Sequence, residues 1–243
     1  MHTSPPNRLC DAHCHLGATP PIDEYLVLNA TSPADWPRIS QRTAKNTRTI
    51  PAIGLHPWQV HNAPRDWQNQ FLSALDDGAR GVGEIGLDQH LAEATLDLQC
   101  AAFAWQLDQA AKRNLPVSIH CLKATGPLLR LLRQGNLPAR GIHLHAYSGS
   151  AEETAQFAEL GAYFSFHAAQ LQAPARKAPD ALRQIPLNRL LIESDAPDTL
   201  PKMMHLQDYL QAAYQRAASI REVDLTALTE QVSANFHRYF LDD

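Results

Sequence analysis

Short β-type runs alternate with helix-type segments along the whole chain, and this alternation limits the possible folds more than any other feature. Between the β-type runs, apolar residues recur every three or four positions, most clearly in residues 96–110 and 225–239, as in amphipathic helices. Alternating strands and helices form parallel sheets through crossover connections. The predicted strands are residues 8–13, 25–30, 49–54, 80–85, 115–120, 140–145, 161–166 and 189–194.

Eight such units in 243 residues fit one closed (β/α)8 TIM barrel, whose typical length is about 250 residues. Only residues 16–24, with adjacent prolines, separate the first two strands, so we expect a distorted barrel whose first helix is shortened or missing. No linker, low-complexity tract or repeat divides the sequence, and residues 1–243 are expected to form a single domain. An open, doubly wound α/β sheet has the same alternation and is the alternative.

Several helix ends have local signals. Ser32-Pro33 is typical of an N-cap followed by the first helical residue, and Ser150 with Glu153 forms a predicted capping box. Glycines are expected to end three helices, at Gly78, Gly135 and Gly161.

Composition excludes several protein classes. The net charge is −4, so no global positive field gathers polyanions, and no run of 18 apolar residues could span a membrane. The first residues lack a secretory apolar stretch, which predicts a cytoplasmic protein without membrane contact. The four cysteines match no zinc-finger spacing and are expected to be free thiols, mostly packed as small hydrophobes.

Acidic and imidazole side chains gather at the predicted strand ends, where TIM barrels build their active sites. Alternation along the first strand places His13 and His15 on one face, within reach of one metal ion. A single histidine at a strand end is usually a hydrogen-bonded rim residue, but buried imidazoles and carboxylates are costly unless paired or metal-bound. Six polar groups converging on one mouth are therefore hard to explain as ordinary rim residues: His13, His15, Glu84, His120, His145 and Asp195.

Two further polar residues lie one layer deeper in the predicted barrel. His143 precedes His145 by two positions and is expected to be a packed, hydrogen-bonded core histidine. Asp11 lies below His13 and is a candidate for orienting a ligand imidazole.

The motifs at these strand ends resemble those of the TatD-like metal-dependent hydrolases in the amidohydrolase superfamily. The resemblance implies one or two divalent metals, with Glu84 bridging and with these five ligands: His13, His15, His120, His145 and Asp195. These six residues are the predicted metal set. The resemblance also implies nuclease activity, because members described as nucleases remove nucleotides from DNA ends. The matching segments are DAHCHL (11–16), GLHPW (54–58), GVGEIGLD (81–88), PVSIHC (116–121), HAYSG (145–149) and ESDAP (193–197).

Departures from the family pattern concern the substrate. Leu122, followed by Lys123, stands where the family often has Arg, and no Arg-Asn-Glu-Pro stretch follows Pro197. Few cations therefore remain for binding phosphates, and a small or short-ended substrate is expected, such as a DNA 3′ or 5′ end. Candidate substrate-binding residues are His56, Trp58, Lys123 and Tyr147, although His56 could equally be a turn residue and single rim aromatics usually pack in the protein.

The mixed nitrogen and oxygen ligand set suits Zn²⁺, Mn²⁺ or Co²⁺, and Mg²⁺ less well. The sequence thus predicts a metal-dependent hydrolase that uses activated water, most simply a phosphodiesterase or deoxyribonuclease by family resemblance. Glu84 and Asp195 are the candidate catalytic carboxylates, with Glu84 as the metal bridge and Asp195 as the proton acceptor. Alternatives are hydrolysis of a small amide, ester or lactone, and a non-catalytic metal-binding adaptor. No obligate protein partner is predicted.

Overall fold

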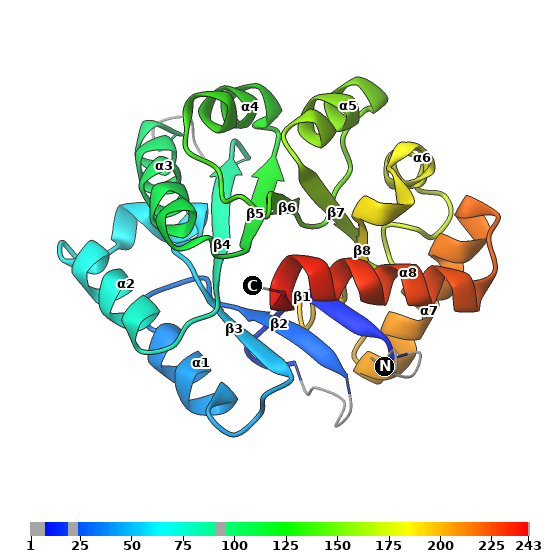
Figure 1. Cartoon of the computed structure of the whole chain (residues 1–243), viewed down its shortest axis with the longest axis horizontal. Helices are drawn as coiled ribbons and strands as arrows, with labels where there is room; N and C mark the ends of the chain where they lie inside the picture. The colour runs from blue at the N-terminus through cyan, green and yellow to red at the C-terminus, as the bar shows by residue number, and fades with distance from the viewer. Residues whose placement is uncertain (1–7, 19–23, 91–95, 243) are drawn as a thin grey trace.

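The computed structural model describes residues 8–18, 24–90 and 96–242, which contain eight parallel strands. The strands follow one another in the order β1 to β8 and curve into a nearly closed TIM-like barrel surrounded by helices (Figure 1). The strands are β1 (Cys10–His15), β2 (Tyr25–Asn29), β3 (Thr49–Ile53), β4 (Gly81–Asp88), β5 (Val117–Leu122), β6 (Ile142–Leu144), β7 (Ala162–Phe166) and β8 (Leu190–Ile192).

Backbone hydrogen bonds join β1 to the segment after β8 and so close the barrel. The Asp195 amide donates to the His13 carbonyl oxygen at 2.9 Å, and the His15 amide donates to the Ala196 carbonyl oxygen at 2.7 Å. Asp11 adds to this closure, because its carboxylate accepts the amide and hydroxyl hydrogens of Ser194 at 2.9 and 2.6 Å. The expectation that Asp11 orients an imidazole is therefore wrong, since its contact with His13 is with the backbone amide.

Helices cover the outside of the barrel, and 3₁₀ or π turns complete the described elements. Between β1 and β2 the described residues contain no helix, as expected, and residues 19–23 lie outside the described part. The helical elements are α1 (Trp36–Thr43), η1 (Pro57–Asn62), α2 (Trp67–Asp76), α3 (Leu96–Arg113), α4 (Thr125–Gln134), α5 (Ala151–Glu159), α6 (Lys177–Gln184), η3 (Leu187–Arg189), α7 (Leu206–Arg221), α8 (Leu225–Phe236) and η4 (His237–Leu241). None of the described helices is long and apolar enough to span a membrane.

Most helix-end predictions are confirmed. The Ser150–Glu153 capping box is present, and Gly78 and Gly161 follow α2 and α5 with φ of +106° and +75°, while Gly135 is the C-cap of α4. The N-cap prediction at Ser32 is wrong, because α1 begins at Trp36. The Asp35 carboxylate accepts the amide and hydroxyl hydrogens of Ser32, which folds this segment into a turn before the helix.

The N-terminal end of the barrel is sealed by apolar packing and two tyrosine hydroxyl groups. Tyr239 in η4 both accepts from the Val117 amide and donates to the Val117 carbonyl, at 2.9 and 2.8 Å. Tyr214 in α7 bonds both backbone groups of Cys10 in the same way, each at 3.0 Å. The four cysteines are free, as predicted, and burial raises the pKa of the Cys10 thiol to about 12.

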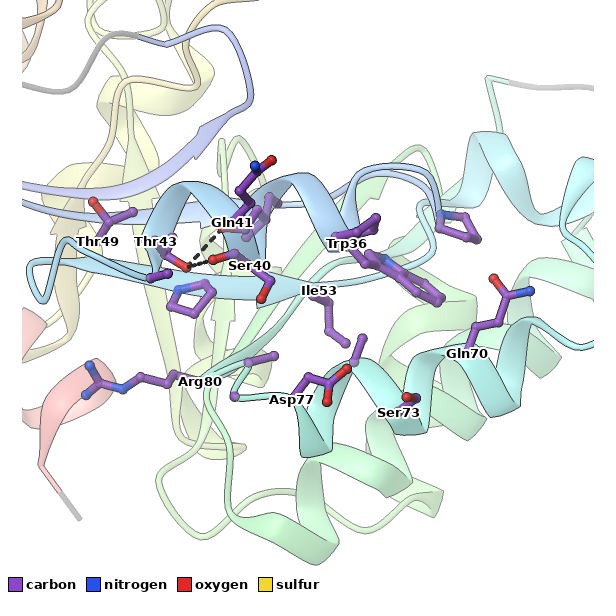
Figure 2. Close-up of a pocket in the computed structure, with 18 of the residues that line it drawn as sticks. Trp36, Ser40, Gln41, Thr43, Thr49, Ile53, Gln70, Ser73, Asp77 and Arg80 are labelled. Atoms are coloured by element: carbon purple, nitrogen blue, oxygen red, sulfur yellow. Dashed lines mark hydrogen bonds between the residues drawn. The ribbon is translucent and has the colours of Figure 1, made fainter.

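A groove of about 930 Å³ lies on the outside of the barrel between α1 and α2 (Figure 2). Thr49, Pro51 and Ile53 of β3 line it, whereas the alternating Ile50 and Ala52 belong to the core inside the barrel. The groove shares no lining residue with the predicted metal set, so it is separate from the candidate site at the C-terminal ends of the strands.

Candidate metal centre

Glu84, in the middle of β4, lies at the centre of a cluster of five imidazoles. One carboxylate oxygen, Oε1, lies 3.2 Å from His56 Nε2, 3.0 Å from His120 Nδ1 and 2.8 Å from His145 Nε2. The other oxygen, Oε2, lies 3.4 Å from Nε2 of both His13 and His15. Burial alone would raise the pKa of Glu84, but the surrounding histidines, His145 and His56 first, hold it well below its usual range. Glu84 is therefore an ionised carboxylate with a separate group of imidazoles on each oxygen.

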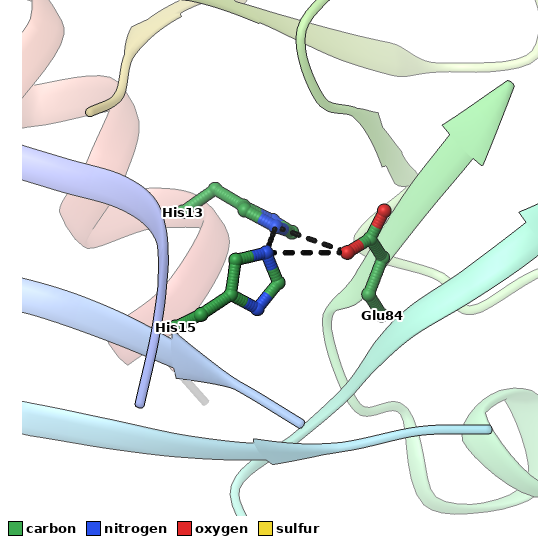
Figure 3. A group of neighbouring side chains, drawn as sticks. All are labelled: His13, His15 and Glu84. Carbon is green, nitrogen blue, oxygen red and sulfur yellow. Dashed lines mark hydrogen bonds and ion pairs between the residues drawn. The ribbon is translucent and has the colours of Figure 1, made fainter. Parts of the chain in front are cut away.

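The pair His13 and His15 comes from alternate positions of β1, as the two-residue period predicts. Figure 3 shows both rings pointing toward Glu84, with their Nε2 atoms 3.1 Å apart. The Nδ1 atom of His15 donates to the Asn29 carbonyl oxygen at 3.1 Å, which fixes the ring against β2. Asp195 completes this half of the cluster, with Oδ1 at 3.5 Å from His15 Nε2 and 4.0 Å from His13 Nε2.

His120 and His145 form the other half, at the ends of β5 and β6. His120 Nδ1 lies 3.3 Å from His145 Nε2, and both atoms face Glu84 Oε1. The opposite nitrogen of His120 contacts Asp88 Oδ2 at 3.2 Å. The same Asp88 oxygen accepts a 2.6 Å hydrogen bond from Trp58 Nε1. Burial would raise the pKa of Asp88, but the hydrogen bonds from His120 and Trp58 lower it to about 2.

Glu193, directly after β8, lies fully buried on the far side of His145. Its Oε1 accepts the Ala146 amide at 2.7 Å and lies 3.7 Å from His145 Nδ1, which has no hydrogen-bond partner of its own. Its Oε2 accepts a short hydrogen bond from the Ser165 hydroxyl. Burial would raise the pKa of Glu193, but the contact with His145 contributes most to lowering it to about 2. Glu193 is therefore also ionised in the interior.

The geometry of these donor atoms fits divalent metal ions. The imidazole nitrogens form two pairs, with 3.1 Å between those of His13 and His15 and 3.3 Å between those of His120 and His145. Each pair faces a different oxygen of the ionised Glu84. Such nitrogen and carboxylate sets are ligands for zinc and similar transition metals. The cluster also attracts positive charge, because Asp195 and Glu84 outweigh burial and raise the pKa of His15 to about 9. The residues present therefore suit two ions that share Glu84, or one ion on either side.

All six residues of the predicted metal set thus come together around Glu84. His56 joins them, because its Nδ1 accepts the Trp58 amide at 3.1 Å and leaves Nε2 to donate to Glu84. It is both the turn residue that caps η1 and a neighbour of the centre. Sequence reasoning gave no role to Glu193 or Asp88, although both lie in the quoted motifs, two residues before Asp195 and four residues after Glu84.

The predicted substrate-binding residues separate into two kinds. Trp58 is 51% exposed beside His56, and Lys123 is exposed next to His90, 3.4 Å from its Nδ1. Tyr147 instead lies in the core, because its ring packs on Phe164 and its hydroxyl bonds Thr154 at 3.1 Å. Its side chain is therefore packed in the protein, which matches the alternative stated for rim aromatics.

Comparisons with known proteins agree with this centre. The family model described as TatD related DNase matches residues 10–241. The chain is 26% identical to the uncharacterized metal-dependent hydrolase YcfH of Escherichia coli K12, over 96% of this chain and 95% of that one. It is 25% identical to the putative deoxyribonuclease TATDN3 of Mus musculus, over 96% and 88% of the two chains.

A solved structure shows the same fold. The crystal structure of YjjV, a TatD homologue from Escherichia coli K12, aligns with a TM-score of 0.87 over 97% of this chain and 99% of that chain, at 23% identity. Because the family model spans almost the whole chain and the barrel gathers the buried histidines and carboxylates, this protein belongs to the TatD-related DNase family of metal-dependent hydrolases.

Proposed function

We propose that this protein hydrolyses phosphodiester bonds at the ends of DNA in a reaction that requires divalent metal. The observation that carries the proposal is the two-sided contact of Glu84, whose separate oxygens face separate imidazole groups. A carboxylate shared in this way is suited to two-metal phosphoryl chemistry. The family match and the deoxyribonuclease name of the mouse relative favour DNA as the substrate.

The chain's residues would divide the ions between two groups. His13, His15 and Asp195 would hold one ion on the Oε2 side of Glu84, and His120 with His145 a second on the Oε1 side. A bound divalent metal supplies Lewis-acid polarisation of the phosphoryl oxygen and lowers the pKa of water. His56 would keep the Glu84 carboxylate in place through its Nε2 hydrogen.

Asp195 is the carboxylate best placed to move protons. Its side chain is 16% exposed, against 4% for Glu84, so it lies at the mouth where water and substrate arrive. In the proposed reaction a water oxygen bonds to phosphorus while Asp195 accepts the released proton. The bond from phosphorus to the leaving oxygen breaks, and Asp195 returns the proton to that oxygen.

The mouth favours a strand end over long duplex DNA. Trp58 presents a half-exposed ring, held by its bond to Asp88, on which a terminal base can stack. Lys123 is the cation that follows β5 at this mouth, whereas affinity for long duplexes comes from many phosphate contacts. A frayed or single-stranded end needs few such contacts, and the proposed substrate is therefore a DNA terminus.

The test is a substrate panel with protein reconstituted with Mn²⁺, Zn²⁺ or Mg²⁺. The panel contains a single-stranded oligonucleotide labelled at either end, a closed circular duplex, a chromogenic phosphodiester, a small amide and a lactone. We expect mononucleotides from the linear strand and an intact circle, and fewer products with Glu84→Gln at the same metal concentration. Turnover of the amide or lactone without phosphodiester cleavage would assign the centre to the other hydrolase class. Inactivity toward every substrate under all metals would refute the proposal.

A further inference from the structure

Three side chains link His13 to Glu193 through an unbroken buried hydrogen-bond chain beneath the metal cluster. His13 Nδ1 lies 2.7 Å from Ser118 Oγ, which lies 3.3 Å from His143 Nδ1. His143 Nε2 lies 2.6 Å from Ser165 Oγ, which donates to Glu193 Oε2. All five residues are at most 2% exposed, so water does not compete for these bonds. The prediction that His143 is a hydrogen-bonded core histidine is confirmed, and its bonds reach in both directions.

The direction of every bond in this chain follows from its carboxylate end. Glu193 accepts the Ala146 amide on one oxygen and can only accept from Ser165 on the other. Ser165 has a single hydroxyl hydrogen, so it must accept from His143 Nε2–H. A neutral His143 then has an unprotonated Nδ1, which accepts the Ser118 hydroxyl hydrogen. The Ser118 oxygen is left to accept from His13 Nδ1–H.

We propose that Ser118, His143 and Ser165 are positioning residues that fix His13 in its Nδ1–H tautomer, so that its Nε2 lone pair faces the metal centre. Reversing the chain would place the hydrogen of His13 on Nε2, between His15 and Glu84, where it blocks coordination. The tautomer of a ligand imidazole is set by the partner of its other nitrogen. Here that partner is Ser118, and the direction of its hydrogen bond is determined by the Glu193 carboxylate through His143 and Ser165.

This proposal depends on the proposed function only for metal binding at His13, because the tautomer can be measured without substrate. Ser165→Ala removes the hydroxyl that donates to Glu193 and accepts from His143, and this hydroxyl contacts no predicted metal ligand. Ser165→Thr keeps a hydroxyl at the same position. Thr229→Val, which removes a buried hydroxyl in α8, is the control for general loss of stability.

The experiment is ¹H–¹⁵N NMR of the histidine rings in metal-free protein, together with Zn²⁺ affinity measured by chelator competition. We expect wild-type His13 to carry its hydrogen on Nδ1, and Ser165→Ala to gain a population with the hydrogen on Nε2. Zn²⁺ affinity should fall about 10–100-fold in Ser165→Ala, the range for losing a partner behind a ligand histidine. Ser165→Thr and Thr229→Val should stay near wild type.

A coupling measurement separates the relay from a packing effect. In a Ser118→Ala background the hydrogen-bond chain no longer reaches His13. Adding Ser165→Ala should therefore change neither the His13 tautomer nor the Zn²⁺ affinity further. An equal fall in Zn²⁺ affinity in both backgrounds would overturn the proposal. So would a wild-type His13 with hydrogen on Nε2 or on both nitrogens. Failure to cleave DNA would refute the proposed function and leave these results unchanged.

Discussion

Glu84→Gln should loosen metal binding much more than Asp195→Asn, because the two carboxylates occupy different depths of the same centre. Glu84 is 3% exposed and lies within 3.4 Å of five imidazole nitrogens. Glutamine has nearly the same shape but no charge, so cations on both sides lose their shared counter-charge. Asp195 contacts the centre on one side only, through Oδ1 at 3.5 Å from His15.

The magnitude follows from the distances around Glu84. A unit charge 3.4 Å away interacts with the carboxylate by about 5 kcal/mol at an effective dielectric constant of 20. Breaking a buried charge pair by removing one partner costs about 3–5 kcal/mol after solvation is included. This corresponds to metal binding weaker by about 10²–10⁴-fold for Glu84→Gln. For Asp195→Asn, which keeps one coordinating oxygen, we expect a loss of at most about tenfold in affinity and of about 10²–10⁴-fold in turnover.

The assay titrates metal into each variant and follows occupancy by chelator competition and turnover on the substrate identified by the panel. Excess metal should restore part of the activity of Glu84→Gln and none of that of Asp195→Asn. The melting temperature gives a second readout, since a ligand at 100 times its dissociation constant stabilises the native state by about 2.7 kcal/mol.

Three results would refute this reasoning. Full metal occupancy and full rate in Glu84→Gln would mean that Glu84 does not bridge ions. Complete rescue of Asp195→Asn by metal would mean that Asp195 acts only as a ligand and accepts no proton. Near-normal behaviour of both variants would make them ordinary rim carboxylates.

Three further outcomes test the scaffold. Gly86→Ala should lower the free energy of unfolding by about 3 kcal/mol or more, because φ is +151° and the added Cβ would lie 2.0 Å from a carbonyl oxygen of β5. Gly126→Ala in α4 has open space around the added Cβ and should stabilise the protein by up to about 1 kcal/mol. Equal effects of the two substitutions in denaturant titrations would contradict the steric argument. Tyr239→Phe removes two buried hydrogen bonds to the backbone of Val117 and should lower stability by about 1–3 kcal/mol, so an unchanged melting curve would argue against that bond pair. The thiol of Cys10 should resist alkylation at pH 8 until the protein unfolds, since burial raises its pKa to about 12, and mass spectrometry of labelled native protein would reveal an exception.

The sequence alone determined the barrel, because alternating strands and helices are a periodic signal, whereas the metal set came from the resemblance of its strand-end motifs to those of the TatD-like hydrolases. Alternating strand and helix patterns predicted every strand of the described chain, and the two-residue period of β1 placed His13 and His15 on one face. Carboxyl ends of parallel strands meet at one end of a barrel, so residues far apart in the chain could be grouped without coordinates.

Only the tertiary structure decided which groups touch, because contacts between strands depend on register and side-chain direction. Asp11 reaches Ser194 across the barrel seam rather than an imidazole, and Tyr147 packs on Phe164 below the rim. The hydrogen-bond chain from His13 in β1 to Glu193 passes through β5, β6 and β7 before it reaches the segment after β8, and no local pattern encodes it. Each member was visible as a polar residue in a strand, but the direction of its hydrogen bonds exists only once the barrel has closed.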